Sequence, residues 1–566
     1  MSAPRCPGRA PAFTAWLDAF FAAYYRSRPV NATFIGVHAF DDRLPDFSEQ
    51  AAGDAAAETA ALLATLRGLP AEPLAESEAL DRRLAEGVLL IQQWEDRSVH
   101  FHRGNPCVYT GEAIFGVIAL FLRPFAPLAD RVEAAIARMA RIPALLAQGR
   151  ANVLRAPGAW IDRAIRECAG ARAFLTGGVD ALIREHGLVD LRLRQTAGAA
   201  AAAFAEFAHH LEVELTPRAT AEYAAGGDAL ELLVRHGHFL DEDPRALAAA
   251  AAEELAAADG YLTAHAAEFG ARTWREALAQ LAGRHPTAEQ YYGRYTEIWR
   301  AARAAAETHG LVTWPEFPIR YVPQPEWARG AAPHLYFLAY RSPAAFDRLP
   351  AVDYLVTPVE PGMPPEEQTR RLRAANDSVI KLNHVIHHGG LGHHVQNWHA
   401  FRAASRIGQV AAVDCASRLA MFCGGTMAEG WACYAVDLMD EIGFLEPLER
   451  YAQRHTRLRQ AARTVVDVRL HLGLFTLEDA AAFYRDRAGM APDAARAEAV
   501  KNSMFPGAAL MYLAGADRIH GLRRELAARG GLDLRRFHDR FLSFGSVPVP
   551  LVAAAMRQEP AHVLSE

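Results

Sequence analysis

Apolar side chains recur at steps of three and four residues through about the first 310 residues of the chain. Two such runs are Leu80, Leu84, Val88, Ile91 and Val132, Ile136, Met139, Ile142. This period places the apolar side chains on one face of an amphipathic helix. The alanine-rich stretches between such runs keep the same period, and alanine has the highest helix propensity. We therefore predict an N-terminal helical lobe over residues 1–310.

The pattern changes at residues 313–327, TWPEFPIRYVPQPEW, where the prolines exclude a continuous helix. Two short runs with strand composition follow, LYFLAY at 335–340 and DYLVTPV at 353–359. Helical periodicity then resumes at about Glu366 and continues through most of the remaining chain. We predict a mainly α fold in which residues 311–566 form a second lobe with a small β-sheet just before a helix that carries His387. The two lobes are expected to form one catalytic unit.

Composition and charge narrow the class of protein. The 566 residues are 51% hydrophobic, which is enough for a large core, and 60 basic against 66 acidic side chains give a net charge of -6. The chain therefore lacks the excess of basic side chains that is typical of proteins that bind nucleic acid. The N-terminal sequence lacks the apolar core of a signal peptide, and no run approaches the roughly 20 apolar residues that span a bilayer. We predict a cytoplasmic protein without nucleic-acid or membrane partners, and leave its oligomeric state open.

The six cysteines are too few and too scattered for a disulfide framework. Three of them cluster between residues 415 and 433, but their spacing lacks the Cys-x-x-Cys signature of a zinc knuckle. We expect the cysteines to be buried free thiols.

Residues 385–398, VIHHGGLGHHVQNW, combine four histidines with three glycines. Neutral imidazole is a common metal ligand. In an unbroken helix His387 and His394 would share a face two turns apart, and His393 would point away from His387. Glycine permits a bulge or break that would bring His393 or His394 back toward His387; the three are Gly389, Gly390 and Gly392. His384 and His388, four residues apart, offer an alternative pair on an undistorted helix.

Two imidazoles that hold a divalent ion usually share it with a carboxylate. Glu429 lies amid small and apolar residues in TMAEGWACYAVDLMDEIG, where an unpaired acid would be costly. Asp440 and Glu441 fit a solvated helix end instead. We therefore predict Glu429 as the third ligand of a divalent metal, with zinc as the first choice and iron or another transition metal as alternatives.

The segments HHGGLGHHVQ and AEGWACYAVDLMDEIG resemble the paired motifs His-Glu-x-x-Pro-Gly-His-His and Glu-Gly-Trp-Ala-x-Tyr of the bacterial domain-of-unknown-function family 885. Four further segments resemble family landmarks in the same order: NATFIGVHAFDDRLPDFS, RTVVDVRLH, EAVKNSMFPGAALMYLAG and FHDRFLSFGSVPVPL. The resemblance thus covers nearly the whole chain. The family is similar in helical architecture to gluzincin-like zinc metallopeptidases such as Taq-type carboxypeptidases, which implies a large metallopeptidase-like fold with a deep groove.

Carried over to this chain, the resemblance implies a metal held by His387, His393 and Glu429, with His394 as a weaker ligand candidate. Tyr512 matches a family tyrosine whose hydroxyl would stabilise an oxyanion, and His471 is a second candidate for that role. Both residues are equally compatible with buried hydrogen-bonded positions. One turn apart, Arg463 and Asp467 are expected to form a structural ion pair.

Two positions depart from the family motif: His388 replaces the glutamate and Leu391 the proline. The glutamate would take a proton from water and return it to the leaving group. Three functions remain open. His388, with an ordinary pKa of about 6.5, acts as the base in hydrolysis of a peptide or small amide. Alternatively, the site performs non-hydrolytic chemistry on a small molecule, as a lyase, an isomerase or an oxidative enzyme. In the third case the scaffold only binds its ligand.

Overall fold

The computed structural model describes residues 11–70, 73–335, 343–347, 349–411, 419–560 and 563–564. The chain folds into two compact units. Unit 1 comprises residues 1–223, 324–349 and 405–422, and unit 2 comprises residues 224–323, 350–404 and 423–566. These units do not follow the expected lobe boundary at residue 310. Residues 224–310 fold with the histidine segment, because α11 (Pro244–His265) packs along α20 (Pro447–His471).

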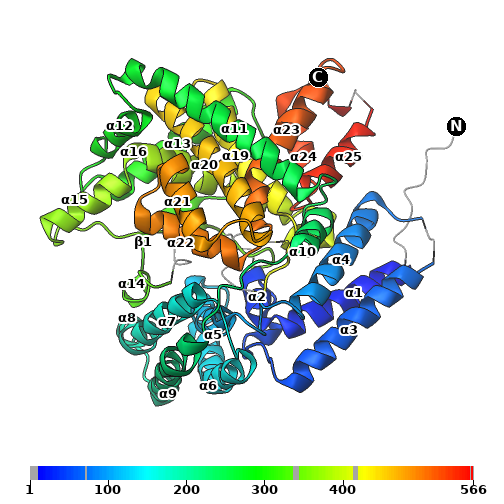
Figure 1. Ribbon diagram of the computed structural model, residues 1–566, viewed down its shortest axis with the longest axis vertical. Helices are drawn as coiled ribbons and strands as arrows, with labels where there is room; N and C mark the ends of the chain where they lie inside the picture. The colour runs from blue at the N-terminus through cyan, green and yellow to red at the C-terminus, as the bar shows by residue number, and fades with distance from the viewer. Residues whose placement is uncertain are drawn as a thin grey trace. The chain divides into compact units, whose positions relative to one another are not determined.

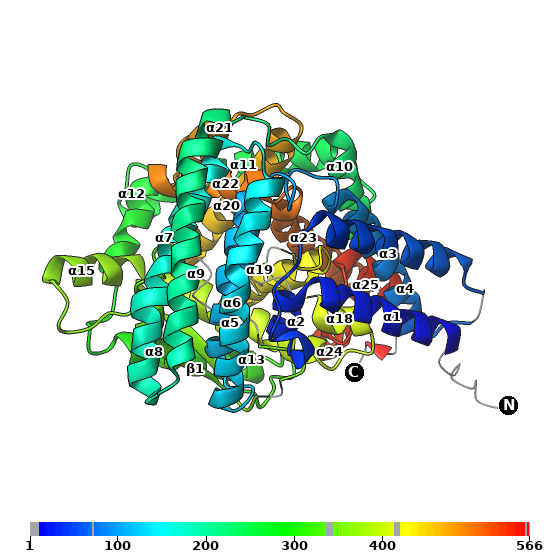
Figure 2. The ribbon, with the colours of Figure 1, turned by 90° about the horizontal axis from the view of Figure 1, so that it is seen from below.

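Unit 1 is helical, and its helices α5, α6, α7 and α9 run side by side (Figure 2). Helix α5 is buried along nearly its whole length because its sequence, PCVYTGEAIFGVIALFL, is apolar on every face. The helices of this unit are α1 (Pro11–Ser27), α2 (Pro29–Ile35), α3 (Glu49–Gly68), α4 (Glu76–Glu95), α5 (Pro106–Leu122), α6 (Leu128–Asn152), α7 (Gly158–Ala173), α8 (Val179–His186), α9 (Leu191–His210), α14 (Glu326–Arg329) and α18 (Arg406–Val410).

Unit 2 contains every predicted site residue. Helix α19 packs against α23, and α20 packs against α11 and α21 (Figure 1). Besides α11 and α20, its helices are α10 (Gly227–Leu232), α12 (Trp274–Ala279), α13 (Tyr291–Thr308), α15 (Pro365–Ala374), α16 (Asp377–Val379), α17 (His393–Ala400), α19 (Gly425–Glu441), α21 (Leu477–Ala488), α22 (Pro492–Met504), α23 (Met511–Ala527), α24 (Leu534–Leu542) and α25 (Val549–Arg557).

A two-stranded parallel sheet lies in unit 2. Strand β1 (Ile319–Pro323) pairs with β2 (Val352–Val356), with Ile319 opposite Val352. β1 therefore lies inside the proline-flanked segment, where we predicted no strand. Proline is tolerated there because each strand of a two-stranded sheet is an edge strand. The N–H groups on the outer side of an edge strand pair with no other strand, so a proline at such a position costs no ladder hydrogen bond. β2 begins and ends earlier than predicted, and most of the LYFLAY run lies outside the described residues.

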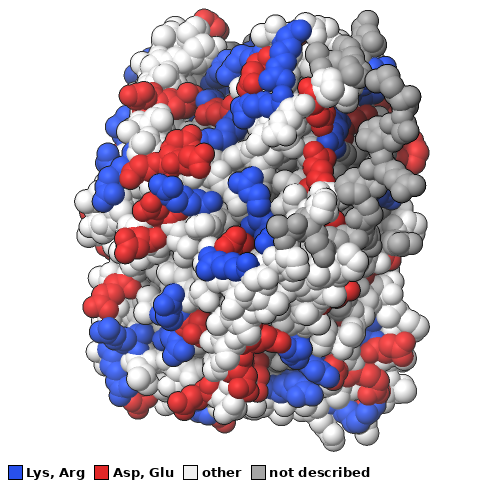
Figure 3. Space-filling model, turned by 90° about the vertical axis from the view of Figure 1, so that its right-hand side faces the viewer, with Lys and Arg blue, Asp and Glu red and all other residues white. Residues whose placement is uncertain are grey.

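The predicted mainly α fold is confirmed. Among the described residues, no helix is both long and apolar enough to cross a membrane. On the face drawn in Figure 3, basic and acidic side chains are interspersed. The four cysteines that the structure describes are buried free thiols, as predicted: Cys107, Cys168, Cys423 and Cys433.

Candidate metal centre

The histidine segment is distorted, as its glycines predict. A π-helix, η8 (Ile380–Gly389), carries His387 and is followed by a break, after which α17 begins at His393. At Gly392 a Cβ atom would lie 2.0 Å from the carbonyl oxygen of His387, so only glycine allows the two backbones to approach this closely. The ring centroids of His387 and His393 are consequently 4.9 Å apart.

Two tryptophans hold the break in place. The indole N–H of Trp299 donates to the carbonyl oxygen of Gly389, and that of Trp431 donates to the carbonyl oxygen of Leu391, each at 2.8 Å. Backbone carbonyls released from a helix inside a protein need such donors. Trp431 belongs to the Glu-Gly-Trp-Ala motif, so this residue ties the two sequence motifs together directly. Neither tryptophan was singled out from the sequence, although Trp431 stands inside a recognised motif.

Three predicted ligand atoms converge on one point. The Nε2 atoms of His387 and His393 lie 3.2 and 3.5 Å from the same oxygen, Oε2 of Glu429. Two ligands of a tetrahedral zinc, each at about 2.0–2.2 Å from the ion, are roughly 3.4 Å apart. The three side chains are 15%, 3% and 11% exposed in that order. Their donor types, spacing and limited exposure therefore fit a divalent metal.

His388 adjoins this group. One ring nitrogen from each of His387, His388 and His393 lies within 4.8 Å of the others. The Nδ1 atom of His388 is 2.8 Å from the carbonyl oxygen of Asn383. Because a carbonyl only accepts, Nδ1 carries the proton and donates it. In this neutral tautomer Nε2 carries no proton, so it is the nitrogen of His388 whose chemistry is that of a base or a metal ligand.

Burial sets the protonation states of the centre. It lowers the pKa of His387, which Glu429 partly offsets, and it lowers the pKa of His388 well below the ordinary value, assisted by His387 and His393. Burial alone would raise the pKa of Glu429, but the two adjacent imidazoles outweigh it and hold that pKa well below its usual range. Neutral imidazoles beside a carboxylate are the forms that bind a metal.

Two other histidines lie outside the group. The Nε2 atom of His394 donates to the carbonyl oxygen of Phe317 at 2.5 Å, and its ring stacks on the Phe317 ring. His384 is hydrogen-bonded through Nδ1 to the hydroxyl of Tyr354 at 2.7 Å. Of the adjacent pair that the sequence left open, His393 faces Glu429, and His394 is engaged elsewhere.

Tyr512 lies at the start of α23. Burial and the negative charge of Glu429 raise the pKa of its hydroxyl well above the ordinary value, so the phenol stays protonated. The guanidinium carbon of Arg463 lies 4.9 Å from the centre of its ring. A protonated, partly exposed phenol within the electrostatic reach of Glu429 is suited to donate a hydrogen bond to a developing oxyanion.

Helices α19 and α23 are brought together by two glycines. A Cβ atom on Gly430 would lie 2.6 Å from the backbone of Gly515, and one on Gly515 would lie 2.2 Å from the carbonyl oxygen of Thr426. No flexible side chain is available there to move aside. Glu429 lies on α19 and Tyr512 on α23, so this close packing holds the two residues on neighbouring helices. It also explains why a glycine follows Glu429, since a side chain there would push the helices apart.

Gly515→Ala is expected to destabilise the protein by about 1–3 kcal/mol, because the added methyl group forces the two helices apart. Gly521→Ala is the matched control: it lies in the same helix, and a Cβ atom there meets nothing within 4 Å. The control should be neutral or gain up to about 1 kcal/mol from helix propensity. Chemical denaturation of the two variants measures the difference, and equal stabilities would contradict this account of the helix contact.

The prediction of an ion pair between Arg463 and Asp467 is wrong. Nε of Arg463 donates to Glu498 at 2.7 Å, and Asp467 instead accepts the backbone N–H groups of Gly507 and Ala509 at 2.9 and 2.8 Å. The turn that offers these two donors comes from a distant part of the sequence and satisfies both carboxylate oxygens. Asp467 thereby fixes the turn that leads into α23 and Tyr512.

His471 is fully buried, with both ring nitrogens engaged. Nδ1 accepts the N–H of Ala225 at 3.3 Å, and Nε2 donates to the carbonyl oxygen of Asn502 at 2.9 Å. These contacts leave no ring N–H for a substrate oxyanion. They favour the buried hydrogen-bonded role, which was the second alternative for this residue.

Asp467 should make stability fall as the pH rises. Burial raises its pKa from 3.8 to about 7, against the opposing effect of the two backbone N–H groups. Between about pH 4 and 7 the folded state keeps a proton that the unfolded state releases, so the free energy of unfolding decreases through this window. Chemical denaturation at several pH values should show the stability of the wild type relative to Asp467→Asn falling up to about pH 7. A difference independent of pH would contradict the assignment.

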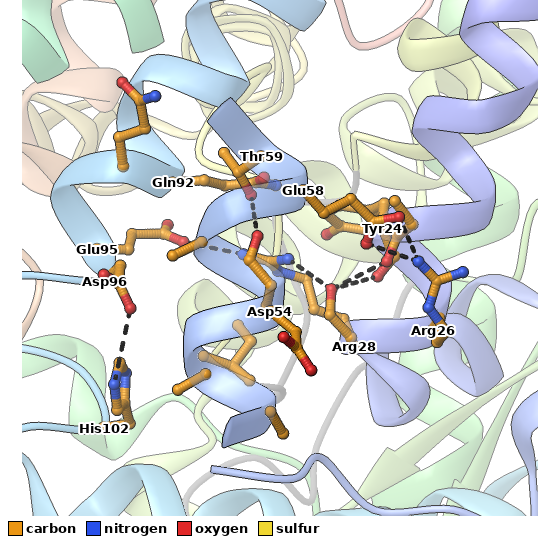
Figure 4. A pocket seen from close by; sticks show the side chains of 18 of the residues that line it. Tyr24, Arg26, Arg28, Asp54, Glu58, Thr59, Gln92, Glu95, Asp96 and His102 are labelled. Carbon is orange, nitrogen blue, oxygen red and sulfur yellow. Dashed lines mark hydrogen bonds and ion pairs between the residues drawn. The ribbon is translucent and has the colours of Figure 1, made fainter. Parts of the chain in front are cut away.

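A separate cavity of about 790 Å³ lies in unit 1 and contains none of the predicted site residues (Figure 4). Two of its arginines pair with acids, Arg28 with Glu95 at 3.1 Å and Arg26 with Glu58. Aromatic side chains, among them Phe20 and Tyr24, line it as well. Acidic side chains outnumber basic ones in its lining, and the described residues that line it form no group of three close metal ligands.

Comparison with known proteins adds a family and a fold. The sequence profile of a family described as "Bacterial protein of unknown function (DUF885)" matches residues 29–556. A solved "putative lipoprotein of unknown function" from Shewanella oneidensis is similar, with a TM-score of 0.77 and 22% identity over 97% of this chain and 100% of that one. A "putative lipoprotein" from Colwellia psychrerythraea has a TM-score of 0.77 and 17% identity over 96% and 98%. None of the curated proteins compared matches the chain.

Proposed function

We propose that this chain, which belongs to the DUF885 family of bacterial proteins of unknown function, is a metal-dependent hydrolase of a peptide or small amide. One observation carries the proposal: Nε2 of His387, Nε2 of His393 and Oε2 of Glu429 converge at the spacing of ligands on one ion. The imidazole of His388 adjoins them and carries its proton on Nδ1. The deep groove implied by the family resemblance is part of the same proposal.

His387, His393 and Glu429 would hold the ion, and zinc suits two imidazoles and one carboxylate. When bound, a divalent ion supplies Lewis acidity that polarises a carbonyl group and acidifies water. Tyr512 donates its hydroxyl hydrogen bond to the carbonyl oxygen as negative charge develops there.

His388 performs the proton transfers in this proposal. Its Nε2 takes a proton from the attacking water as the water oxygen bonds to the carbonyl carbon. The same nitrogen then gives that proton to the amide nitrogen as the carbon–nitrogen bond breaks, which releases a carboxylic acid and an amine. The hydrogen bond from Nδ1 to Asn383 keeps the imidazole in the tautomer that this sequence requires.

A second function is favoured by the grouping of three imidazole nitrogens within 4.8 Å. In it, His388 is a further metal ligand, and the site performs lyase, isomerase or oxidative chemistry on a small molecule. An imidazole-rich site suits zinc, iron or copper. The two functions predict different effects of a carboxylate at position 388. It should preserve hydrolysis if His388 is the base, and raise hydrolysis if His388 is a metal ligand.

A panel of peptides and N-acyl amides incubated with zinc-loaded protein tests the hydrolase directly. We expect cleavage that a chelator abolishes and zinc restores, and that His387→Ala removes. His309→Ala, which replaces an exposed histidine of the same unit, should cleave as the wild type does. Cleavage that survives both the chelator and His387→Ala would rule out the proposed site.

Cellular location is a further part of the proposal. The sequence leads us to expect the cytoplasm, whereas the two similar solved structures are described as putative lipoproteins. Fractionation of cells that express the native gene distinguishes the two locations by the presence of the protein in the cytosolic or the membrane fraction.

A further inference from the structure

Three basic side chains of α20 and α22 act electrostatically on a single acid, Glu498. Arg463 pairs with Glu498 at 2.7 Å. Arg459, one turn earlier in α20, and Lys501, three residues after Glu498, form no hydrogen bond or ion pair with any other residue that the structure describes. All three side chains are partly buried. We call Arg459, Arg463 and Lys501 the basic cluster.

The charges of the basic cluster converge on Glu498. Burial would raise the pKa of that carboxyl, but Arg463, Lys501 and Arg459 outweigh it and lower the pKa to about 2. One carboxylate thus faces three cations. The next acid along the helix, Asp467, is held by backbone N–H groups. Partly buried cations without counter-charge are costly unless an anion completes them.

The basic cluster adjoins the candidate metal centre through Arg463. Its guanidinium carbon lies 4.9 Å from the centre of the Tyr512 ring. Burial raises the pKa of Tyr512, and the charge of Arg463 opposes that effect. Burial lowers the pKa of His387, and the charge of Arg463 lowers it further. Two arginines of the unit 1 cavity, Arg26 and Arg28, are by contrast each paired with a glutamate (Figure 4). The partly buried Arg28 thus has an acid of its own, whereas the three cations of the basic cluster share Glu498.

We infer that the substrate carries a free carboxylate, which Arg459 and Arg463 bind while its amide group lies at His387, His388 and Tyr512. This inference rests on the proposed hydrolase function and adds a substrate class to it: an amide, such as an N-acyl amino acid or a peptide, with an anionic end close to the bond that is cut. The planar guanidinium fork matches a carboxylate through two parallel hydrogen bonds. Lys501 adds charge without that geometry.

The test compares the binding of N-acyl amino acids with that of their carboxamides. N-acetyl and N-benzoyl derivatives of glycine, alanine and phenylalanine serve as the panel, with titration calorimetry as the readout. Chelator-treated, metal-free protein is used, because a carboxylate would otherwise bind the metal itself. We expect at least one free acid to bind about tenfold more tightly than its carboxamide, as a charge-assisted hydrogen-bond pair implies.

Variants of α20 identify the residues responsible. Arg459→Gln breaks no ion pair and should reduce the preference for the acid to about threefold or less. Arg463→Lys keeps a cation beside Glu498 and should reduce it as well, because the fork is lost. Arg454→Gln, an exposed arginine of the same helix, is the control and should keep the full preference.

Either of two results overturns the inference: no acid of the panel binds more tightly than its carboxamide, or the preference survives in both Arg459→Gln and Arg463→Lys. The hydrolase proposal fails separately, through the absence of chelator-sensitive cleavage in zinc-loaded protein. Preferential binding of acids without any cleavage would leave the carboxylate site standing and remove the hydrolase.

Discussion

His388→Ala is expected to lower kcat/KM for amide hydrolysis by about 10²–10⁴-fold, the range that a positioned general base contributes. The sequence resemblance implies that His388 takes the place of the motif glutamate, and its Nδ1–H is fixed on the carbonyl oxygen of Asn383. Alanine removes the proton acceptor and leaves His387, His393 and Glu429 in place. The metal content should therefore stay at the wild-type level while the rate falls.

His388→Glu separates the two functions that the site supports. If His388 is the base, a carboxylate in its place should leave hydrolysis within about tenfold of the wild type, since a glutamate performs the same proton transfers. If His388 is a metal ligand in other chemistry, the same change should raise hydrolysis well above the wild type. Steady-state rates on one amide of the panel, with metal content measured in parallel, distinguish these results. Unchanged hydrolysis in His388→Ala would contradict the role of His388 as a base.

Glu429→Gln is expected to weaken zinc binding by about 100-fold or more, because its Oε2 is the oxygen that both imidazoles face. Even residues that only support metal ligands change affinity by about 10–100-fold when replaced. Glutamine keeps the shape of the side chain but removes the charge that balances the ion. Competition with a chromophoric chelator measures the affinity.

Glu441→Gln is the matched control for Glu429→Gln. Glu441 lies in the same helix, and its carboxylate is exposed and pairs with Arg523 at 2.8 Å. The sequence made it the weaker ligand candidate, and the control should bind zinc as the wild type does. Equal zinc affinities for the two variants would show that Glu429 is not a ligand.

The sequence predicts the distortion of the histidine segment but not the choice between its two adjacent histidines. The glycines indicate a break, and the helical angles show that a break is needed. Whether His393 or His394 then turns inward depends on Phe317, which accepts a hydrogen bond from His394 across a gap of 77 residues. Local periodicity carries no information on that contact.

The same limit explains the ion pair that was wrongly predicted on α20. A spacing of four residues allows Arg463 and Asp467 to meet, and helical geometry favours such pairs. Asp467 instead binds two N–H groups of the turn at residues 507–509, and Arg463 binds Glu498. Helix type and apolar faces follow from local sequence, whereas the partners of buried charges are set by segments that meet only on folding. The basic cluster was missed for this reason.

The metal content of the purified protein tests the central claim most directly. After incubation with zinc and removal of the excess, elemental analysis should find about one zinc ion per chain in the wild type and in His309→Ala, as expected for two imidazoles and a carboxylate around one ion. His387→Ala and His393→Ala should each retain little or none while remaining folded by circular dichroism. A wild type that binds no zinc or other divalent metal, or equal binding in His387→Ala, would contradict the assignment of this site.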